Sequence, residues 1–295
     1  MNENKTNINW YPGHMFKTKK QIIEDIKLID VVVEILDARI PLSSQNPDIK
    51  HITANKKKVV ILNKSDLAND GETKKWVQYF KKQGIIAIPT DANLGKGVKE
   101  TLNAVKELMK EELEKAANKG IKNKNIRMMI VGVPNVGKSS FINRMTNKKS
   151  AEVGNRPGVT KQKQWLRISS NIELLDTPGV LWPKFESEEV GLNLAYIGTI
   201  KDEIIDKTNA AYNLLKFLEK NNKKELFERY KLTEEDINSI MSEDTILTLM
   251  ELIAKKRGAL ISGGEIDYEK VASLILNDFR TAKIGKITLE KVNEQ

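Results

Sequence analysis

The chain has 295 residues, 40% of them hydrophobic and 30% charged, which is typical of a folded protein with one large domain or two modest ones. It contains no cysteine, which excludes disulfides, thiolate metal sites and a cysteine nucleophile. The first 25 residues lack a secretory signal and no apolar run could cross a membrane, so we expect a cytoplasmic protein without a membrane partner. A net charge of +9 favours a nucleic-acid partner over a simple solubility effect.

The N-terminal 28 residues are expected to form a first unit. After a polar start, residues 10–16 (WYPGHMF) combine aromatic side chains, a Pro-Gly turn and His14, one of only two histidines. Taken alone, His14 is more readily interpreted as a surface or packing residue than as a functional one. A helix pattern follows, in which apolar residues recur at helical spacing from Ile22 to Ile29.

Strand and helix patterns alternate over the next hundred residues. Buried-strand patterns rich in β-branched residues lie at 31–36, 58–62 and 85–88. Helix patterns lie at 71–84 and 99–118. A polar motif follows each strand, and the three are Asp37-Ala-Arg39, Asn63-Lys64-Ser65-Asp66 and Asp91-Ala92.

A fourth strand pattern, 126–131, leads into a phosphate-binding loop. The segment Gly132-Val-Pro-Asn-Val-Gly-Lys-Ser139 fits the P-loop pattern G-x-x-x-x-G-K-[ST]. Gly132 and Gly137 let the backbone curl around phosphates, Lys138 reaches the β- and γ-phosphates, and Ser139 can offer its hydroxyl to Mg²⁺. The helix predicted over 139–146 points its positive end at the same anions. The strand–loop–helix context favours a nucleotide site over a glycine turn without a ligand.

Two further strand patterns, 164–168 and 172–175, complete the predicted sheet. A Gly- and Pro-containing loop that ends at Thr160 precedes them, and Asp176-Thr-Pro-Gly179 follows them. Alternating strands and helices predict a parallel sheet covered on both faces, with ligands at the carboxyl ends of the strands, where these motifs lie. We therefore predict an α/β fold, a three-layer sandwich of the P-loop NTPase class, over residues 29–182.

Beyond residue 182 the sequence predicts only helices, at 190–197, 209–219, 234–241, 245–256 and 268–283. We interpret residues 183–295 as a separate helical domain that binds RNA. Its candidate RNA contacts are basic residues on or beside the last two helices: Lys255, Lys256, Arg257, Arg280, Lys283 and Lys286. The favourable helix dipole explains some of them without RNA.

The Asn63-Lys64-x-Asp66 motif narrows the nucleotide to guanine. The Asp66 carboxylate can accept two hydrogen bonds from N1–H and the 2-amino group of guanine, a donor pair that adenine lacks. The Lys64 stem can lie over the base, and Asn63 can tie this loop to the P-loop. At the other end of the nucleotide, Asp176 would order Mg²⁺ through water and the Gly179 N–H would sense the γ-phosphate. Thr160 would contact both Mg²⁺ and the γ-phosphate.

These motifs together resemble the circularly permuted translation-factor-class GTPases, and within them the bacterial ribosome biogenesis GTPase A (YlqF) family. The resemblance covers nearly the whole chain and is carried by residues 10–15, 37–39, 63–66, 132–139, 158–160 and 176–179. Here the N-K-x-D motif precedes the P-loop, the reverse of the order in ordinary GTPases. The resemblance therefore implies a permuted G domain whose switch segment after Gly179 continues directly into the helical domain.

The resemblance also implies an activity and a partner. GTP would be hydrolysed to GDP slowly by the protein alone and faster when stimulated by a late precursor of the large (50S) ribosomal subunit, bound through its rRNA. Val180 and Leu181 stand where many GTPases have a water-orienting glutamine, and the resemblance gives that role to His14. It also implies Mg²⁺ and, through Asn135, K⁺. We expect a monomer when free and no DNA partner.

The candidate site residues fall into three groups, for nucleotide binding, catalysis and Mg²⁺. Expected nucleotide contacts are Asn63, Lys64, Ser65, Asp66, Asp91, Ala92, Asn135, Val136, Gly137, Lys138, Ser139, Ser140, Asp176 and Gly179. Expected catalytic residues are His14, Lys138 and Thr160, and expected Mg²⁺ ligands are Ser139, Thr160 and Asp176. The family has Ser-Ala or similar where this chain has Asp91-Ala92: the Ala92 N–H could meet guanine O6, and the role of Asp91 stays open.

Two other functions remain open. An RNA-binding assembly scaffold could use GTP as a structural ligand with negligible hydrolysis, and the missing glutamine favours this alternative. An ATPase would require the Asp66 contact to be wrong. Lys138, Ser139, Thr160 and Asp176 favour the enzyme over the scaffold.

Overall fold

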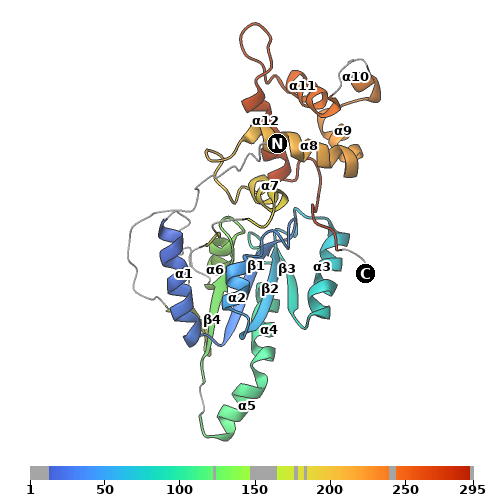
Figure 1. Cartoon of the computed structure of the whole chain (residues 1–295). Coiled ribbons are helices and arrows are strands. Elements are labelled where there is room, and N and C mark those ends of the chain that lie inside the picture. The colour runs from blue at the N-terminus through green and yellow to red at the C-terminus, as the bar shows by residue number, and fades with distance from the viewer. Residues whose placement is uncertain are drawn as a thin grey trace.

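A computed structural model describes residues 13–121, 124–146, 165–175, 179–182, 185–238 and 244–292. The described chain has a sheet part and, above the carboxyl edge of the sheet, a helical part (Figure 1). None of the helices in these ranges is both long and apolar enough to cross a membrane.

The sheet part is built on a six-stranded sheet of order β3-β2-β1-β4-β6-β5. Its strands are β1 (Val31–Asp37), β2 (Lys57–Asn63), β3 (Ile86–Thr90), β4 (Ile126–Val131), β5 (Trp165–Ser169) and β6 (Ile172–Leu175). All seven residues of β1 are buried, because this strand lies at the centre with helices on both faces. Asp37 pairs with Asn63 in the parallel register of β1 and β2, so the polar motifs that end these strands lie side by side.

The expectation of a wholly parallel sheet is wrong for β5. This edge strand runs antiparallel to β6, whereas the other five strands are parallel. Only Ser170 and Asn171 connect β5 to β6, and a parallel pair would need a crossover of a dozen or more residues.

Helices cover both faces of the sheet. They are α1 (Gly13–Asp25), the 3₁₀ turn η1 (Ile26–Leu28), α2 (Pro47–Ile52), α3 (Asp70–Lys82), α4 (Val98–Leu108), α5 (Lys110–Asn118) and α6 (Lys138–Thr146). Successive side chains of β1 point to opposite faces of the sheet. Val32 packs with α1 and α2 on one face, and Val33 packs with α4 and α6 on the other. The helix expected over 99–118 is broken at Met109, where ψ is 4° and α5 turns away. Figure 1 shows α5 projecting beyond the sheet.

The helical part contains α7 (Glu188–Tyr196), α8 (Lys207–Asn221), α9 (Lys223–Tyr230), α10 (Glu234–Asn238), α11 (Thr245–Arg257) and α12 (Tyr268–Arg280). The sequence did not predict α9, whose eight residues are mostly charged, or the short α2. Helix α12 ends three residues before the expected boundary. Its end is closed by a left-handed Ala282 and by a hydrogen bond from Lys283 N–H to the Asp278 carbonyl, which is the pattern of a helix C-cap.

The two parts are joined by a shared core and by the C-terminal segment. One hydrophobic cluster runs from the strands into α8, α11 and α12. The segment 284–292 then returns over the sheet part: Leu289 N–H donates to Arg39 O (2.9 Å), and Trp76 Nε1 donates to Glu290 O (3.0 Å). The helical part is therefore fixed over the carboxyl edge of the sheet, where the P-loop follows β4 and the N-K-x-D motif follows β2.

Candidate nucleotide-binding site

The P-loop joins β4 to α6, and its conformation requires glycine. Gly132 has φ of 154°, and a Cβ there would lie 2.5 Å from the carbonyl oxygen of Ile35. Gly137 has φ of 96°, and a Cβ there would collide with the Asn63 side chain. The two glycines of the motif are thus needed for close approach to β1 and to the N-K-x-D loop.

Lys138 lies inside the loop that it belongs to. Its Nζ donates to the carbonyl oxygens of Gly132 (3.1 Å) and Val133 (2.8 Å), and the residue is buried. A Cβ on Gly179 would lie 2.6 Å from the same Nζ, so the glycine of the D-x-x-G motif is packed against the P-loop lysine. Thr160 and Asp176 lie outside the described residues, and His14 lies in the first turn of α1, where its side chain is not described.

Asn63 connects the P-loop to the loop after β3. Its Nδ2 donates to Val136 O (2.6 Å), and its Oδ1 accepts from the Ala92 N–H (3.0 Å). This is the tie to the P-loop that the sequence suggested for Asn63. Ser65 is also held toward β3, because both its N–H and its hydroxyl donate to Thr90 O at 3.1 Å.

The side chain of Asp91 shapes the turn that follows it. Its Oδ1 accepts from the N–H groups of Asn93 (2.9 Å) and Leu94 (3.1 Å), as in an Asx turn. The Asp91 side chain thus stabilises the backbone turn that contains Ala92. The Asp91 charge also acts on Asp66: burial raises the pKa of Asp66, and the nearby Asp91 carboxylate raises it further.

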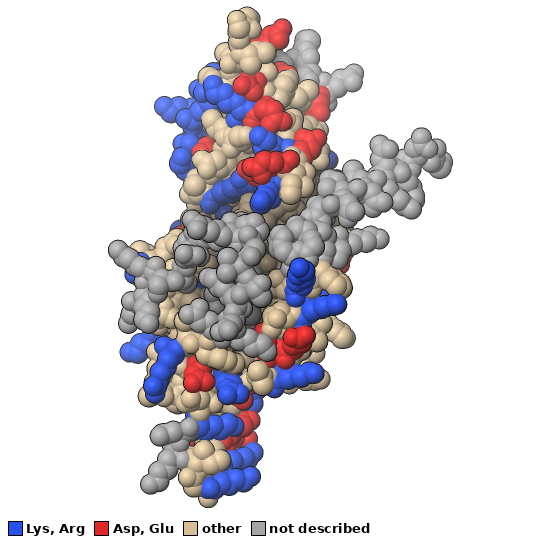
Figure 2. All heavy atoms as spheres, turned by 90° about the vertical axis from the view of Figure 1, so that its left-hand side faces the viewer, with Lys and Arg blue, Asp and Glu red and all other residues tan. Residues whose placement is uncertain are grey.

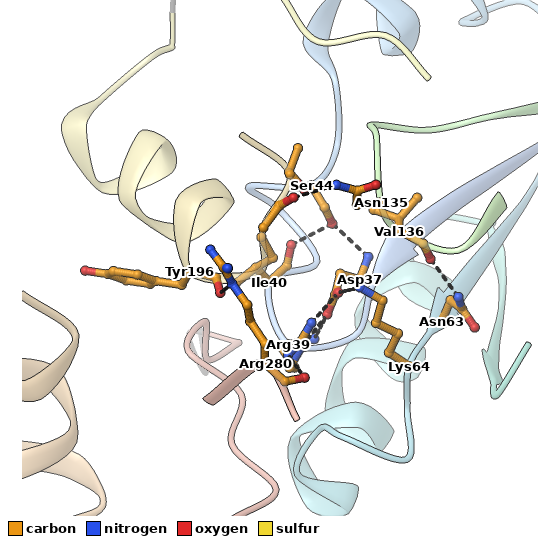
Figure 3. Close-up of polar contacts among 12 residues, drawn as sticks. Asp37, Arg39, Ile40, Ser44, Asn63, Lys64, Asn135, Val136, Tyr196 and Arg280 are labelled. Atoms are coloured by element: carbon orange, nitrogen blue, oxygen red, sulfur yellow. Dashed lines mark hydrogen bonds and ion pairs between the residues drawn. The ribbon is translucent and has the colours of Figure 1, made fainter. Parts of the chain in front are cut away.

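A cluster of charged side chains, Asp37, Arg39 and Lys64, lies beside the N-K-x-D loop (Figure 3). Arg39 Nε and Nη2 donate to the two carboxylate oxygens of Asp37 at 2.9 and 2.8 Å, and Lys64 Nζ lies 3.2 Å from Asp37 Oδ2. Burial would raise the pKa of Asp37, but the charges of Arg39 and Lys64 and the hydrogen bonds from Arg39 outweigh burial and hold it well below its usual range.

The sequence analysis gave Asp37 and Arg39 no role. A physical signal was present, because two opposite charges at the end of a buried, mostly apolar strand are seldom buried themselves unless they are paired. The cluster places Lys64, whose backbone has φ of 57°, at the rim of the pocket.

A pocket of about 250 Å³ lies between the P-loop and the loops after β2 and β3 (residues 63–66 and 91–93), which together we call the base loop. Of the expected nucleotide contacts, it is lined by Asn63, Lys64, Asp66, Asp91, Ala92, Asn135, Gly137 and Ser140. Ser65, Val136, Lys138, Ser139 and Gly179 are not among its lining residues. Arg39, Ile197 and Arg280 also line it, and the sequence analysis did not place them there.

The candidate RNA contacts differ in how they are held. Lys255 is exposed. Lys256 Nζ donates to Lys231 O and contacts Asp236, and Arg257 donates to Arg229 O. Lys283 Nζ lies 3.8 Å from Asp278, and Lys286 Nζ lies 3.6 Å from Asp70; both lysine side chains are half exposed. Figure 2 shows one face of the molecule, on which Lys and Arg of the helical part lie among Asp and Glu.

Arg280 disagrees with the expectation of an exposed RNA contact. Its side chain is 22% exposed, and its guanidinium is bound to Asp202 and to the carbonyl oxygens of Ala195 and Tyr196. The side chain therefore faces the interior, at the junction with the nucleotide pocket, where its hydrogen-bond donors are used within the protein.

The fold and this pocket define a P-loop protein of the α/β class, in which an N-K-x-D loop lies beside the phosphate loop. A family model described as a 50S ribosome-binding GTPase matches residues 127–251. Ribosome biogenesis GTPase A of Bacillus cereus is 48% identical over 287 residues, which are 97% of this chain and 95% of the relative. Mitochondrial ribosome-associated GTPase 1 of Bos taurus is 31% identical over 96% of this chain and 88% of its own length. The crystal structure of GNP-bound YlqF from T. maritima is similar, with a TM-score of 0.66 and 28% identity over 95% of this chain and 100% of that chain.

These comparisons decide the family. The chain belongs to the ribosome biogenesis GTPase A family, and its activity is that of a GTPase.

Proposed function

We propose that this chain binds the precursor of the large (50S) ribosomal subunit in its GTP-bound state and hydrolyses GTP to GDP when the particle stimulates it. The observation that carries the nucleotide assignment is the contact of Asn63 with both Val136 O and Ala92 N–H. It joins the phosphate loop and the base loop around one pocket. The family membership supports the assembly of the large subunit as the process that this GTPase serves.

Asp66 is the residue that tests guanine recognition. Asp66→Asn replaces an acceptor with a group that also donates, so it should weaken GDP binding and favour the xanthosine nucleotide, whose base presents a carbonyl in place of the 2-amino group. Dissociation constants for the two nucleotides measure the switch. Unchanged GDP affinity in Asp66→Asn would contradict the assignment of the base loop.

The G domain is proposed to be circularly permuted. The strands β1 to β3 occupy one half of the sheet and β4 to β6 the other. Exchanging the two blocks along the chain would keep every strand pairing and change only the connections. The order of motifs in this chain, with Asn63-Lys64-x-Asp66 before the P-loop, is what that exchange gives. The same exchange places the end of the G domain just after Gly179, so the chain continues from there into the helical part.

The P-loop fits a bound Mg²⁺. Ser139 is the second residue of α6, directly after the buried Lys138, and hydroxyl and carboxylate oxygens are the ligands that Mg²⁺ prefers. We propose Ser139 and Thr160 as direct ligands and Asp176 as a ligand through water. Bound there, Mg²⁺ would neutralise charge on the β- and γ-phosphates.

His14 is proposed to orient the attacking water. Val180 and Leu181, which follow Gly179, are both 2% exposed and have no polar side-chain atom to hold water. His14→Ala should lower the particle-stimulated rate of GTP hydrolysis and leave GTP affinity intact. A normal stimulated rate in this variant would remove His14 from the mechanism.

Asn135 is proposed to help bind K⁺ near the phosphates. Its Nδ2 donates to Gly198 O (2.6 Å), which orients the amide and leaves Oδ1 as the potential cation ligand. A cation there would stabilise developing phosphate charge without an arginine finger. Turnover should therefore be faster in K⁺ than in Na⁺ buffer at equal ionic strength, and equal turnover would argue against this role.

The helical part is proposed to contact rRNA through Lys255, Lys256, Arg257 and Lys283. The exposed Lys255 and the half-exposed Lys283 best support this. Such phosphate contacts make binding to the particle weaken steeply with salt. We further propose a cytoplasmic monomer. The alternative, a scaffold that binds GTP without hydrolysing it, is favoured only by Val180 and Leu181 at the glutamine position.

A further inference from the structure

Arg280, at the end of α12, holds the segment that follows α7. Its Nε donates to Tyr196 O (2.9 Å) and its Nη2 donates to Ala195 O (2.8 Å). Its Nη1 and Nη2 also donate to the two carboxylate oxygens of Asp202, at 2.8 and 2.7 Å. All these acceptors lie in residues 195–202. Because a guanidinium is planar and rigid, four hydrogen bonds from it fix this segment on α12.

The same segment touches the P-loop. Gly198 O accepts the hydrogen bond from Asn135 Nδ2, and Thr199 Oγ1 donates to Pro134 O (3.1 Å). A Cβ on Gly198 would lie 3.4 Å from the guanidinium, so the backbone of this turn is packed on Arg280. The turn therefore lies between α12 and the phosphate end of the pocket.

The carbonyl group of Arg280 reaches the base end of the same pocket. It accepts a hydrogen bond from Arg39 Nη1 (3.2 Å), and Arg39 binds Asp37, which contacts Lys64 (Figure 3). Arg39 is 1% exposed and its guanidinium packs on the ring of Phe279, so it has little freedom to move independently of α12. One residue of the helical part is thus connected to both ends of the pocket.

We propose that Arg280 is a positioning residue through which the helical part sets the affinity of the pocket for guanine nucleotide. This inference rests on the proposed assignment of the pocket to GTP and GDP. A shift of α12 would move the 195–202 segment against the P-loop and, through Arg39 and Asp37, would move Lys64. Since such coupling is reciprocal, a particle bound to the helical part would change nucleotide affinity, and nucleotide would change particle affinity.

The rate of GDP release tests this role. Arg280→Gln should release a fluorescent GDP analogue on the order of tenfold faster than the unaltered chain, measured well below the unfolding temperature. Arg229→Gln is the matched control: Arg229 also donates from Nε and Nη2 to one aspartate, Asp278 (2.9 Å), and its side chain is 27% exposed, but it does not line the pocket. We expect Arg229→Gln to release GDP at the unaltered rate. Equal release from folded Arg280→Gln would overturn the proposal, as would equal acceleration by both variants.

A milder variant guards against failure of Arg280→Gln to fold. Asp202→Asn keeps the carbonyl contacts of Arg280 and removes only the charge of a partly exposed partner. It should accelerate GDP release in the same direction by a smaller factor. Unchanged release from this variant, when Arg280→Gln cannot be obtained, would count against the proposal.

Thr199→Val tests the route through the 195–202 segment. It removes the hydroxyl that donates to Pro134 O and keeps nearly the same shape. If Arg280 acts through this segment, the double variant Thr199→Val/Arg280→Gln should accelerate GDP release by less than the product of the accelerations in Thr199→Val and in Arg280→Gln. Independent, multiplicative effects would overturn this route. If the unaltered chain binds no GDP, the proposed function fails; if it binds GDP and Arg280→Gln changes nothing, only this inference fails.

Discussion

At the scale of residues, the site depends on carboxylates with opposite environments. Asp37 is buried between two cations, which keep it ionised and make it an anchor for Lys64. Asp66 is exposed at the pocket rim, where partial burial and the neighbouring Asp91 disfavour its charge. In the proposed role, Asp66 accepts both hydrogen bonds from guanine only when it is ionised, so its environment should make nucleotide binding sensitive to acid.

The first prediction concerns this pH dependence. As pH falls through the raised pKa of Asp66, the carboxylate is protonated and GDP affinity should fall, at a higher pH than for an ordinary aspartate. Asp91→Asn should move this loss to lower pH, because it removes a negative charge but keeps the Oδ1 that holds the turn. GDP dissociation constants measured from neutral pH to about pH 4 give both curves.

Exposed Glu107→Gln provides the control for loss of a carboxylate elsewhere, and its curve should overlay that of the unaltered chain. If Asp91→Asn and the unaltered chain lose affinity at the same pH, the Asp91 charge does not act on the group that binds guanine.

At the scale of elements, the P-loop is held by its neighbours as much as by its own sequence. Gly132 lies against the backbone of β1, and Gly137 lies against Asn63 from β2. The motif predicted a loop that binds phosphate, and the packing gives its two glycines a structural role that does not depend on nucleotide. The cost of a substitution should therefore appear in the stability of the nucleotide-free protein.

The second prediction compares two glycines. Gly132→Ala should destabilise the protein by about 3 kcal/mol or more, because left-handed strain of roughly 1–2 kcal/mol is joined by a clash with Ile35 O. Gly84→Ala should destabilise the protein only by the left-handed backbone strain, since Gly84 has φ of 73° and no atom lies within 4 Å of the added Cβ. Urea unfolding without nucleotide measures both. A cost for Gly132→Ala equal to that for Gly84→Ala would show that the loop relaxes away from β1.

Sequence patterns predicted most elements, but they did not predict the contacts between distant ones. Strands and long helices followed from β-branched runs and helical periodicity, and the N-K-x-D and P-loop motifs lie at one pocket as expected. Antiparallel β5 and the break at Met109 depend on connection length and local backbone rather than on periodicity. The role of Arg280 depends on the packing of α12 against residues 195–202, which are distant in the chain and carry no shared pattern.

At the scale of the whole molecule, the sheet part and the helical part act as one packed body. The cluster that contains Val33 and Ile61 of the sheet also contains Leu214, Ile253 and Leu276 of the helical part. The C-terminal segment adds a second connection: the Glu290 carboxylate accepts from the Leu42 N–H (2.6 Å) and from the Ser43 N–H (2.8 Å). One hydrophobic cluster thus extends across the predicted domain boundary at residue 182.

The third prediction concerns unfolding of the whole chain. Because the core is shared, nucleotide-free protein should unfold in one transition, with the fluorescence of the four tryptophans, which all precede residue 183, and far-UV circular dichroism giving the same midpoint. Removing residues 284–292 should lower that midpoint. The outcome that contradicts the shared core is two resolved transitions, one of which stays unchanged after the truncation.

We propose above that GTP hydrolysis in this pocket is controlled by a ribosomal particle. The most direct test is GTP turnover in K⁺ buffer with Mg²⁺, with and without isolated large ribosomal subunits. We expect slow turnover by the protein alone and a large stimulation by the subunits. Tight GTP binding with no stimulation would contradict it and would favour the scaffold that holds GTP as a structural ligand.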